Sequence, residues 1–88
     1  MTKSFNIFAD FNNVDEHGRI RLNTNGTLID LNEKKLELHM NMELTLDDHD
    51  GLIAVGIVEF SIEESVWVAK IDWTKFEKTS FKLKNIHL

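Results

Sequence analysis

The densest group of side chains that could bind a metal ion is the acidic run Asp47, Asp48, His49 and Asp50, which stands directly before Gly51. Hard cations such as Ca²⁺ and Mn²⁺ are held by several oxygen ligands, and three carboxylates in one turn could supply part of a weak site. The spacing lacks the alternating acids and the distant glutamate of an EF-hand loop. Aspartates that bond to neighbouring backbone N–H groups are also typical of a hairpin turn, and we favour this structural role.

Other patterns of catalytic or cofactor-binding residues are absent from the sequence. The histidines His17, His39, His49 and His87 have no paired metal-ligand spacing, and a chain without cysteine offers no thiolate ligand, disulfide or cysteine nucleophile. No serine stands in a Gly-x-Ser-x-Gly setting, and the glycines are too scattered to form a phosphate-binding loop. We therefore expect no cofactor, and a non-enzymatic role is favoured.

Two aromatic features could serve recognition. Phe8 alternates with polar residues, and with Asp10, Arg19 and Arg21 it forms a candidate recognition surface. Trp67 and Trp73 could form a stacking platform, but their strand neighbours are apolar, which favours burial of both in the core.

The 88 residues, 42% hydrophobic and 28% charged, predict a single domain over 1–88. The net charge is −5, although residues 75–88 carry four lysines and one glutamate. A mainly acidic body repels phosphate backbones, which disfavours nucleic-acid binding. The sequence has neither a signal-peptide pattern nor a long apolar run, and it predicts a cytoplasmic protein that does not bind membranes.

Alternation of apolar and polar residues is the strongest structural signal. It extends from Leu36 to Leu46 and predicts a half-buried strand, which a turn at residues 47–51 joins to the apolar run 52–58 in a hairpin. A second turn at Glu63–Glu64 predicts the next pairing. The expected partners are Phe60 with Trp67, Val58 with Ala69, Gly56 with Ile71, and Ala54 with Trp73.

The N-terminal third is less clearly patterned. Phe5–Phe11 and Arg19–Asn23 alternate on either side of a turn at His17–Gly18, and we expect them to form an antiparallel pair. Residues 24–35 allow two structures. Asn25–Gly26 is typical of a type I′ hairpin, whereas Thr27–Asp30 resembles a helix capping box, and we favour the helix.

These elements predict a mainly β fold: a small antiparallel barrel or strongly curved sheet of SH3-like or OB-like size, with five to six strands and one short helix near residues 27–35. Residues 79–88 would form a tail or a closing strand. Such folds carry many functions, so the fold alone does not identify one.

Three runs, Gly18–Thr24, Gly26–Leu28 and Trp67–Trp73, resemble a group of small bacterial proteins with no assigned activity. The resemblance spans about residues 5 to 73. It implies a bacterial origin and assigns no functional residue.

The predicted hairpin over residues 52–73 is apolar on both faces, which is unusual for a monomer because a small domain has one interior. We therefore expect a protein-interaction domain that forms a homodimer or binds another protein. The alternatives are a small-molecule or metal-binding domain, an oligomeric enzyme with an interface site and, less favoured, a nucleic-acid binder. The expected interface residues are Ile53, Val55, Ile57, Val66 and Val68.

Overall fold

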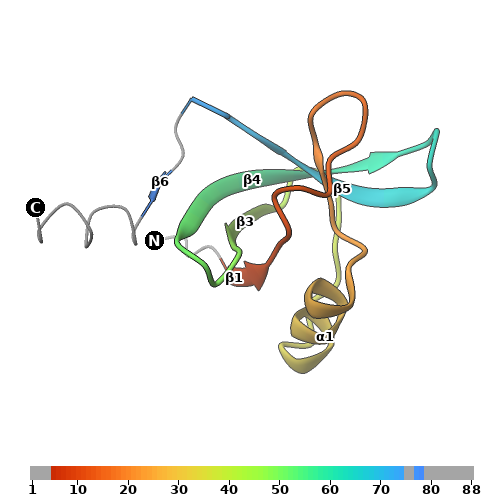
Figure 1. The fold of residues 1–88 in the computed structure, drawn as a ribbon. Helices are drawn as coiled ribbons and strands as arrows, with labels where there is room; N and C mark the ends of the chain where they lie inside the picture. Colours follow the sequence, from red (N-terminus) through yellow and green to blue (C-terminus); the bar gives the residue numbers. More distant parts are fainter. Residues whose placement is uncertain (1–4, 75–76, 79–88) are drawn as a thin grey trace, which may run out of the picture.

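The computed structural model describes residues 5–74 and 77–78 and has a mainly β fold with one short helix (Figure 1). The elements are β1 (Phe5–Phe8), β2 (Ile20–Arg21), α1 (Asn25–Glu33), β3 (Glu43–Asp47), β4 (Leu52–Ser61), β5 (Val66–Ile71) and β6 (Glu77–Lys78). The strand order is β1-β3-β4-β5-β2, and β6 pairs with β4 beside this path. The path does not close into a barrel. Within the described residues, no helix is long and apolar enough to cross a membrane.

The antiparallel meander β3-β4-β5 confirms the predicted hairpins. In the turn between β3 and β4, His49 and Gly51 take the left-handed conformation, with φ of 59° and 104°. The β4–β5 register contains the expected pairs of Phe60 with Trp67, Val58 with Ala69, and Gly56 with Ile71. The fourth expected pair, Ala54 with Trp73, is wrong because β5 ends at Ile71.

The expectation of a wholly antiparallel sheet is wrong, because β1 lies parallel to β3 with Phe5 opposite Leu44. The expected pairing of Phe5–Phe11 with Arg19–Asn23 is wrong for the same reason. The chain does turn back near Gly18, with φ of 78°, but the backbone bonds there link Asn13 to Arg21 and Asp15 to Arg19. β2 then pairs with β5 instead of β1.

The predicted short helix is confirmed, and it begins earlier than expected. Thr24 is the N-cap, and its hydroxyl accepts a bond of 3.3 Å from the backbone N–H of Thr27. Asn25 and Gly26, which could have formed a type I′ turn, instead make the first turn of α1. Thr27 is therefore inside the helix, and its side chain is fully buried.

The predicted strand from Leu36 to Leu46 is wrong in its first half, since β3 begins at Glu43. Asn41 takes the left-handed conformation with φ of 68°, and the N–H of Met42 bonds to the carbonyl of His39. This turn interrupts the extended chain. Leu36 and Leu38 are still partly buried against the core, so the alternation reflects burial there without strand pairing.

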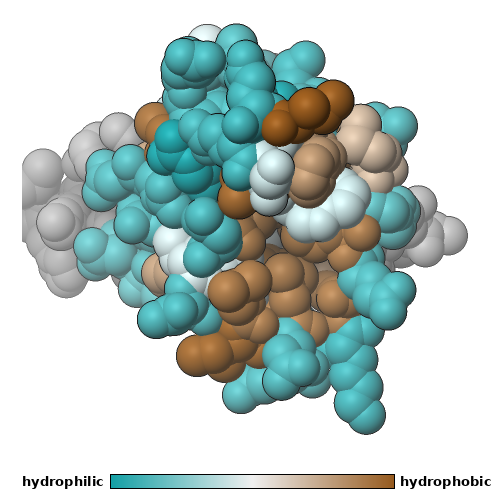
Figure 2. Space-filling view, turned by 90° about the vertical axis from the view of Figure 1, so that its right-hand side faces the viewer, coloured by the Kyte–Doolittle hydropathy of each residue, from teal (hydrophilic) through white to brown (hydrophobic). Residues whose placement is uncertain are grey.

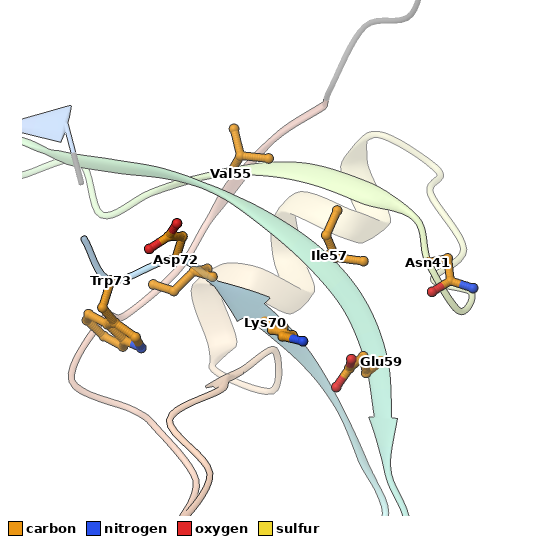
Figure 3. Close-up of a pocket in the computed structure, with 8 residues that line it drawn as sticks. Asn41, Val55, Ile57, Glu59, Lys70, Asp72 and Trp73 are labelled. Atoms are coloured by element: carbon orange, nitrogen blue, oxygen red, sulfur yellow. The ribbon is translucent and has the colours of Figure 1, made fainter. Parts of the chain in front are cut away.

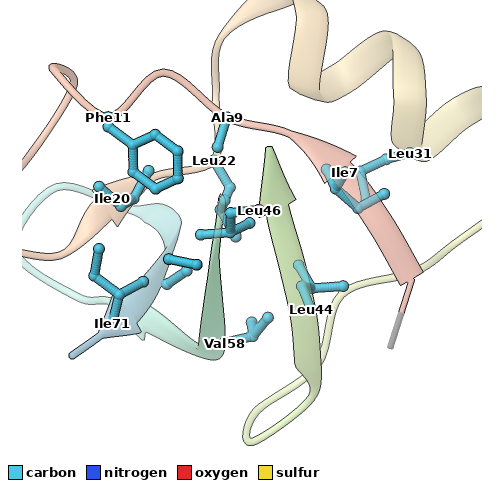
Figure 4. Close-up of a cluster of buried hydrophobic side chains, with 12 residues drawn as sticks. Ile7, Ala9, Phe11, Ile20, Leu22, Leu31, Leu44, Leu46, Val58 and Ile71 are labelled. Atoms are coloured by element: carbon cyan, nitrogen blue, oxygen red, sulfur yellow. The ribbon is translucent and has the colours of Figure 1, made fainter. Parts of the chain in front are cut away.

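The core lies on one face of the sheet and is extended by residues of α1 and of the loops (Figure 4). Gly56 is required on this face, because an added Cβ would lie 3.0 Å from both Ala69 Cβ and Leu46 Cδ1. The buried core residues are Ile7, Ala9, Phe11, Ile20, Leu22, Leu31, Leu44, Leu46, Ala54, Val58, Ala69 and Ile71.

The two tryptophans differ in burial. Trp67 packs partly buried against the core, with its ring 5.1 Å from that of Phe60 in an edge-on arrangement. Trp73 is 44% exposed, so its predicted core position is wrong. Its indole Nε1 donates a 2.9 Å bond to the carbonyl of Gly18, beyond the end of β5. Residues 79–88, the predicted tail or closing strand, lie outside the described residues.

Candidate functional site

A groove of about 780 Å³ lies on the face of β4 and β5 opposite the core (Figure 3). We call it the outer groove. Alternation along β4 directs Val55, Ile57 and Glu59 to this face, since Ala54, Gly56 and Val58 face the core. The lining residues are Asn41, Val55, Ile57, Glu59, Lys70, Ile71, Asp72 and Trp73.

The outer groove combines exposed apolar side chains with charges of both signs. Val55 is 53% exposed and Trp73 is 44% exposed, which are high values for large apolar residues in a small domain. Lys70 is exposed and forms no salt bridge with any other described residue. The groove is therefore suited to a ligand or partner surface with an apolar part and at least one anionic group.

Of the five predicted interface residues, the structure brings Val55 and Ile57 into the outer groove. Ile53 and Val66 are half-buried on the same strands. Val68 is fully buried, so its expected exposure is wrong. Its cross-strand neighbours are Glu59 and Arg21, whose long side chains belong to the salt bridges described next.

Two salt bridges link the Asn13–Arg21 region to the β4–β5 hairpin, and a third, between Arg19 and Asp15, lies within that region. Arg19 Nε donates to Asp15 Oδ2 at 2.9 Å, and Arg19 Nη1 donates to Glu59 Oε1 at 3.1 Å. Arg21 binds both carboxylate oxygens of Glu64, at 2.7 and 2.9 Å. These bonds hold both guanidinium groups in fixed positions above the strands.

Asp15 is almost completely buried and is the acceptor on which this region depends. Burial by itself raises the pKa of the Asp15 carboxyl. Hydrogen bonds from the backbone N–H groups of Arg19 and His17 and from the Arg19 side chain outweigh burial, and the pKa lies below its usual value. The hydrogen bond from Arg21 lowers the pKa of Glu64 in the same way.

The acidic turn has the bonding of an ordinary hairpin connection. Asp47 Oδ1 accepts the N–H of His49 at 2.7 Å, while Asp48 Oδ1 accepts those of Asp50 and Leu52 at 2.8 and 3.0 Å. Two of its three carboxylates thus bond to the local backbone. This bonding agrees with the favoured structural role of the turn, and the alternative of a weak metal site there is not tested.

The predicted recognition residues are divided between two regions. Phe8 is half-buried, with its ring stacked 5.5 Å from that of His49 and close to Gly26 of α1. Asp10 Oδ1 accepts the N–H of Asn12. Arg19 and Arg21 instead bond to residues of the β4–β5 hairpin, as described above.

The sequence did not single out Asn41, Glu59, Lys70 or Asp72 as residues of a site, and it placed Trp73 in the core instead of at the groove. Trp73 was misplaced because strand alternation does not apply beyond Ile71. Asn41 joins the groove because the Met40–Asn41 turn brings it to β4, where its N–H bonds to the carbonyl of Val58.

Apolar side chains also reach the surface elsewhere. Figure 2 shows them gathered on the side that carries the β4–β5 turn and α1, with hydrophilic residues around them. Phe60, 39% exposed, and Trp67 belong to this end of the hairpin.

Comparison with known proteins adds no assignment: no family model matches the chain, and neither the curated proteins nor the solved structures give a significant match.

Proposed function

We propose that this chain is a non-catalytic interaction domain that forms a two-fold symmetric homodimer through the outer groove. The observation that carries the proposal is the exposure of Val55 and Trp73 beside Ile57 in a groove of about 780 Å³. Apolar surface costs about 25 cal/mol per Å² when it stays in water, so covering this face favours association.

The edges of the sheet favour association through a face. At the β1 edge, the N–H of Phe8 donates to Asp30 Oδ2 at 2.8 Å, and its carbonyl accepts from Thr27 Oγ1. At the β2 edge, the N–H of Arg21 donates to the carbonyl of Asn13. These bonds occupy groups that would otherwise pair with a strand of another molecule.

The charges of the outer groove favour a second copy as the partner. In a two-fold interface one patch meets itself, so a patch must carry both signs of charge to be complementary. Lys70 lies in the same groove as Glu59 and Asp72, and a second copy would bring its acids opposite this lysine. Exposed pairs of this kind contribute about 0 to 1 kcal/mol each, and the apolar contact supplies most of the affinity.

The test is the molar mass in solution, measured by light scattering after size exclusion at several concentrations. An association free energy of about 8 kcal/mol corresponds to a dissociation constant of about 1 µM. We therefore expect the protein to be a dimer at about 100 µM, well above that constant. Val55→Lys should shift the protein to a folded monomer. Ile29→Lys is the matched control, because Ile29 is 55% exposed on α1, away from the groove. A wild-type monomer at this concentration would contradict the proposal, as would equal effects of the two substitutions.

A second candidate function is small-molecule binding in the same groove. Its volume lies within the range of about 300 to 1,000 Å³ that is common for ligand pockets, and it has an apolar wall with a few polar groups. A thermal-shift screen separates the two candidates. The second function would be favoured if the wild-type chain is monomeric, if a small ligand raises its melting temperature, and if the same ligand does not raise the melting temperature of Val55→Lys.

A further inference from the structure

The structure brings together a set of metal-ligand side chains that the sequence does not place near each other. Glu16 and His17 lie in the loop before β2, whereas Glu63 lies in the β4–β5 turn. One ligand atom from each of the three side chains lies within 4.8 Å of the other two. Among the described residues, no other group of three such side chains comes this close together. We call them the Glu-His-Glu cluster.

The imidazole of His17 lies between the two carboxylates. Its Nε2 is 3.2 Å from Glu63 Oε1 and 3.7 Å from Glu16 Oε2. Ligand atoms about 2.0 to 2.2 Å from a zinc ion are separated from each other by roughly 3 to 3.5 Å. Small side-chain rotations would therefore bring all three atoms within bonding distance of one ion.

The backbone around the cluster is fixed on both sides. The N–H of His17 donates to buried Asp15 at 2.9 Å, and that of Gly18 donates to the Asp15 carbonyl. In the β4–β5 turn, the N–H of Glu64 donates to Ser61 Oγ. A metal ion would thus join two loops that are already ordered, which reduces the entropy lost on binding.

Charge compensation distinguishes these two glutamates from the acids around them. Arg19 forms salt bridges with Asp15 and Glu59, and Arg21 with Glu64. Neither Glu16 nor Glu63 has a lysine or arginine partner among the residues that the structure describes. Two carboxylates without a basic partner converge on one imidazole, and a divalent cation would balance their charge.

The space beside the cluster can hold the remaining ligands. His17 also lines a hollow of about 320 Å³ with Arg19, Glu59 and Lys70. All three cluster side chains are more than half exposed, at 72% for Glu16, 54% for His17 and 63% for Glu63. Water can therefore complete the coordination.

We propose that Glu16, His17 and Glu63 form a binding site for a divalent transition-metal ion of the zinc class. The donor set of one imidazole and two carboxylates favours Zn²⁺, Mn²⁺ or Co²⁺ over Ca²⁺ and Mg²⁺, which prefer sites made only of oxygen ligands. The proposal does not depend on dimer formation, because the outer groove contains none of these three residues.

The test is titration of the full chain with Zn²⁺ by isothermal calorimetry, with Mg²⁺ as the comparison ion. We expect one Zn²⁺ per chain with a dissociation constant on the order of 10 µM, and a melting temperature that rises with Zn²⁺ because the ion binds the native state. His17→Gln and Glu63→Gln should each weaken binding at least tenfold. Both residues are exposed, so the variants should fold, which circular dichroism checks.

His39→Gln and Glu37→Gln are the matched controls, since both side chains are exposed outside the cluster. They should bind Zn²⁺ like the wild type. Absence of Zn²⁺ binding at millimolar concentration would overturn the proposal. Binding that survives both His17→Gln and Glu63→Gln would overturn it too, and would place the ion elsewhere, for example at His49 in the acidic turn.

Discussion

At the scale of single residues, Asp15 has the most consequential position. A carboxylate in a small domain is usually exposed, and Asp15 is only 6% exposed. It is tolerated because two backbone N–H groups and the Arg19 side chain bond to it. These bonds fix the loop that carries His17, and they place Arg19 beside Glu59.

Asp15→Asn should destabilise the fold by about 1.5 to 3 kcal/mol at neutral pH, the range for hydrogen bonds to a charged group. The amide N–H₂ would face the donor Arg19 Nε, and the ion pair would be lost. Urea unfolding measures the effect, with Asp50→Asn at an exposed position as the control.

The pH dependence gives a second check on Asp15. The folded-state pKa of the Asp15 carboxyl lies below its usual value of 3.8, so the ionised group stabilises the fold above that value. This contribution is lost as the pH falls through the lowered folded pKa. The difference between the wild type and Asp15→Asn should therefore shrink in acid. A constant difference from about pH 7 to about pH 2.5 would contradict this role.

At the scale of elements, α1 and β1 depend on one close contact. A Cβ added to Gly26 would lie 2.6 Å from Cδ2 of Phe8, which is closer than side chains can approach. The absence of a side chain at Gly26 lets the helix approach the strand, where Thr27 and Asp30 bond to the backbone of Phe8. The glycine that resembles a hairpin signal in the sequence thus serves helix packing.

Gly26→Ala should destabilise the protein by about 1 to 3 kcal/mol, because α1 must move away from Phe8. In an exposed helix the same change usually stabilises by about 0.5 to 1 kcal/mol, so even the sign is informative. Thermal unfolding measures it, with Asn25→Ala as a neighbouring exposed control. The cost should be smaller in a Phe8→Leu background, and strict additivity of the two changes would argue against the contact.

The sequence was sufficient to predict the elements that depend on local pairing. The β4–β5 register follows from a turn at Glu63–Glu64 and from small residues opposite large ones, such as Gly56 opposite Ile71. The parallel pair of β1 and β3 could not be predicted, because it joins strands on either side of α1 and is not specified by a turn. The left-handed turn at Asn41 was missed because the alternation of apolar and polar residues indicates which side chains are buried, and it does not indicate where the backbone turns.

The candidate sites were predicted to different extents for the same reason. Val55 and Ile57 could be assigned to an outer face from alternation within one strand. Val68 shares that alternation, yet it is buried, because β2 lies beside it. The sequence does not show this neighbour, so the burial of Val68 could not be predicted. The Glu-His-Glu cluster depends on a contact between two distant loops, and nothing in the spacing of its residues predicts it.

At the scale of the whole molecule, association should be detectable through Trp73. In Trp67→Phe, Trp73 is the remaining tryptophan, and it is 44% exposed at the outer groove. Its emission should move to shorter wavelength as the protein concentration rises, because dimer formation removes the indole from water. The shift should be absent when Val55→Lys is added. An emission maximum independent of concentration in a chain that does dimerise would place the interface on another face.

The parallel contact between β1 and β3 also bears on how quickly the chain can fold. The β3, β4 and β5 strands are joined by short turns, so their contacts are local and can form early. Phe5 must instead find Leu44, after β2 and α1 have been traversed. Closing so long a loop is slow, and until β1 arrives the edge of β3 is unpaired. During synthesis β1 leaves the ribosome before β3, yet it is among the last strands of this sheet to pair, and in that interval the nascent sheet is most exposed to aggregation.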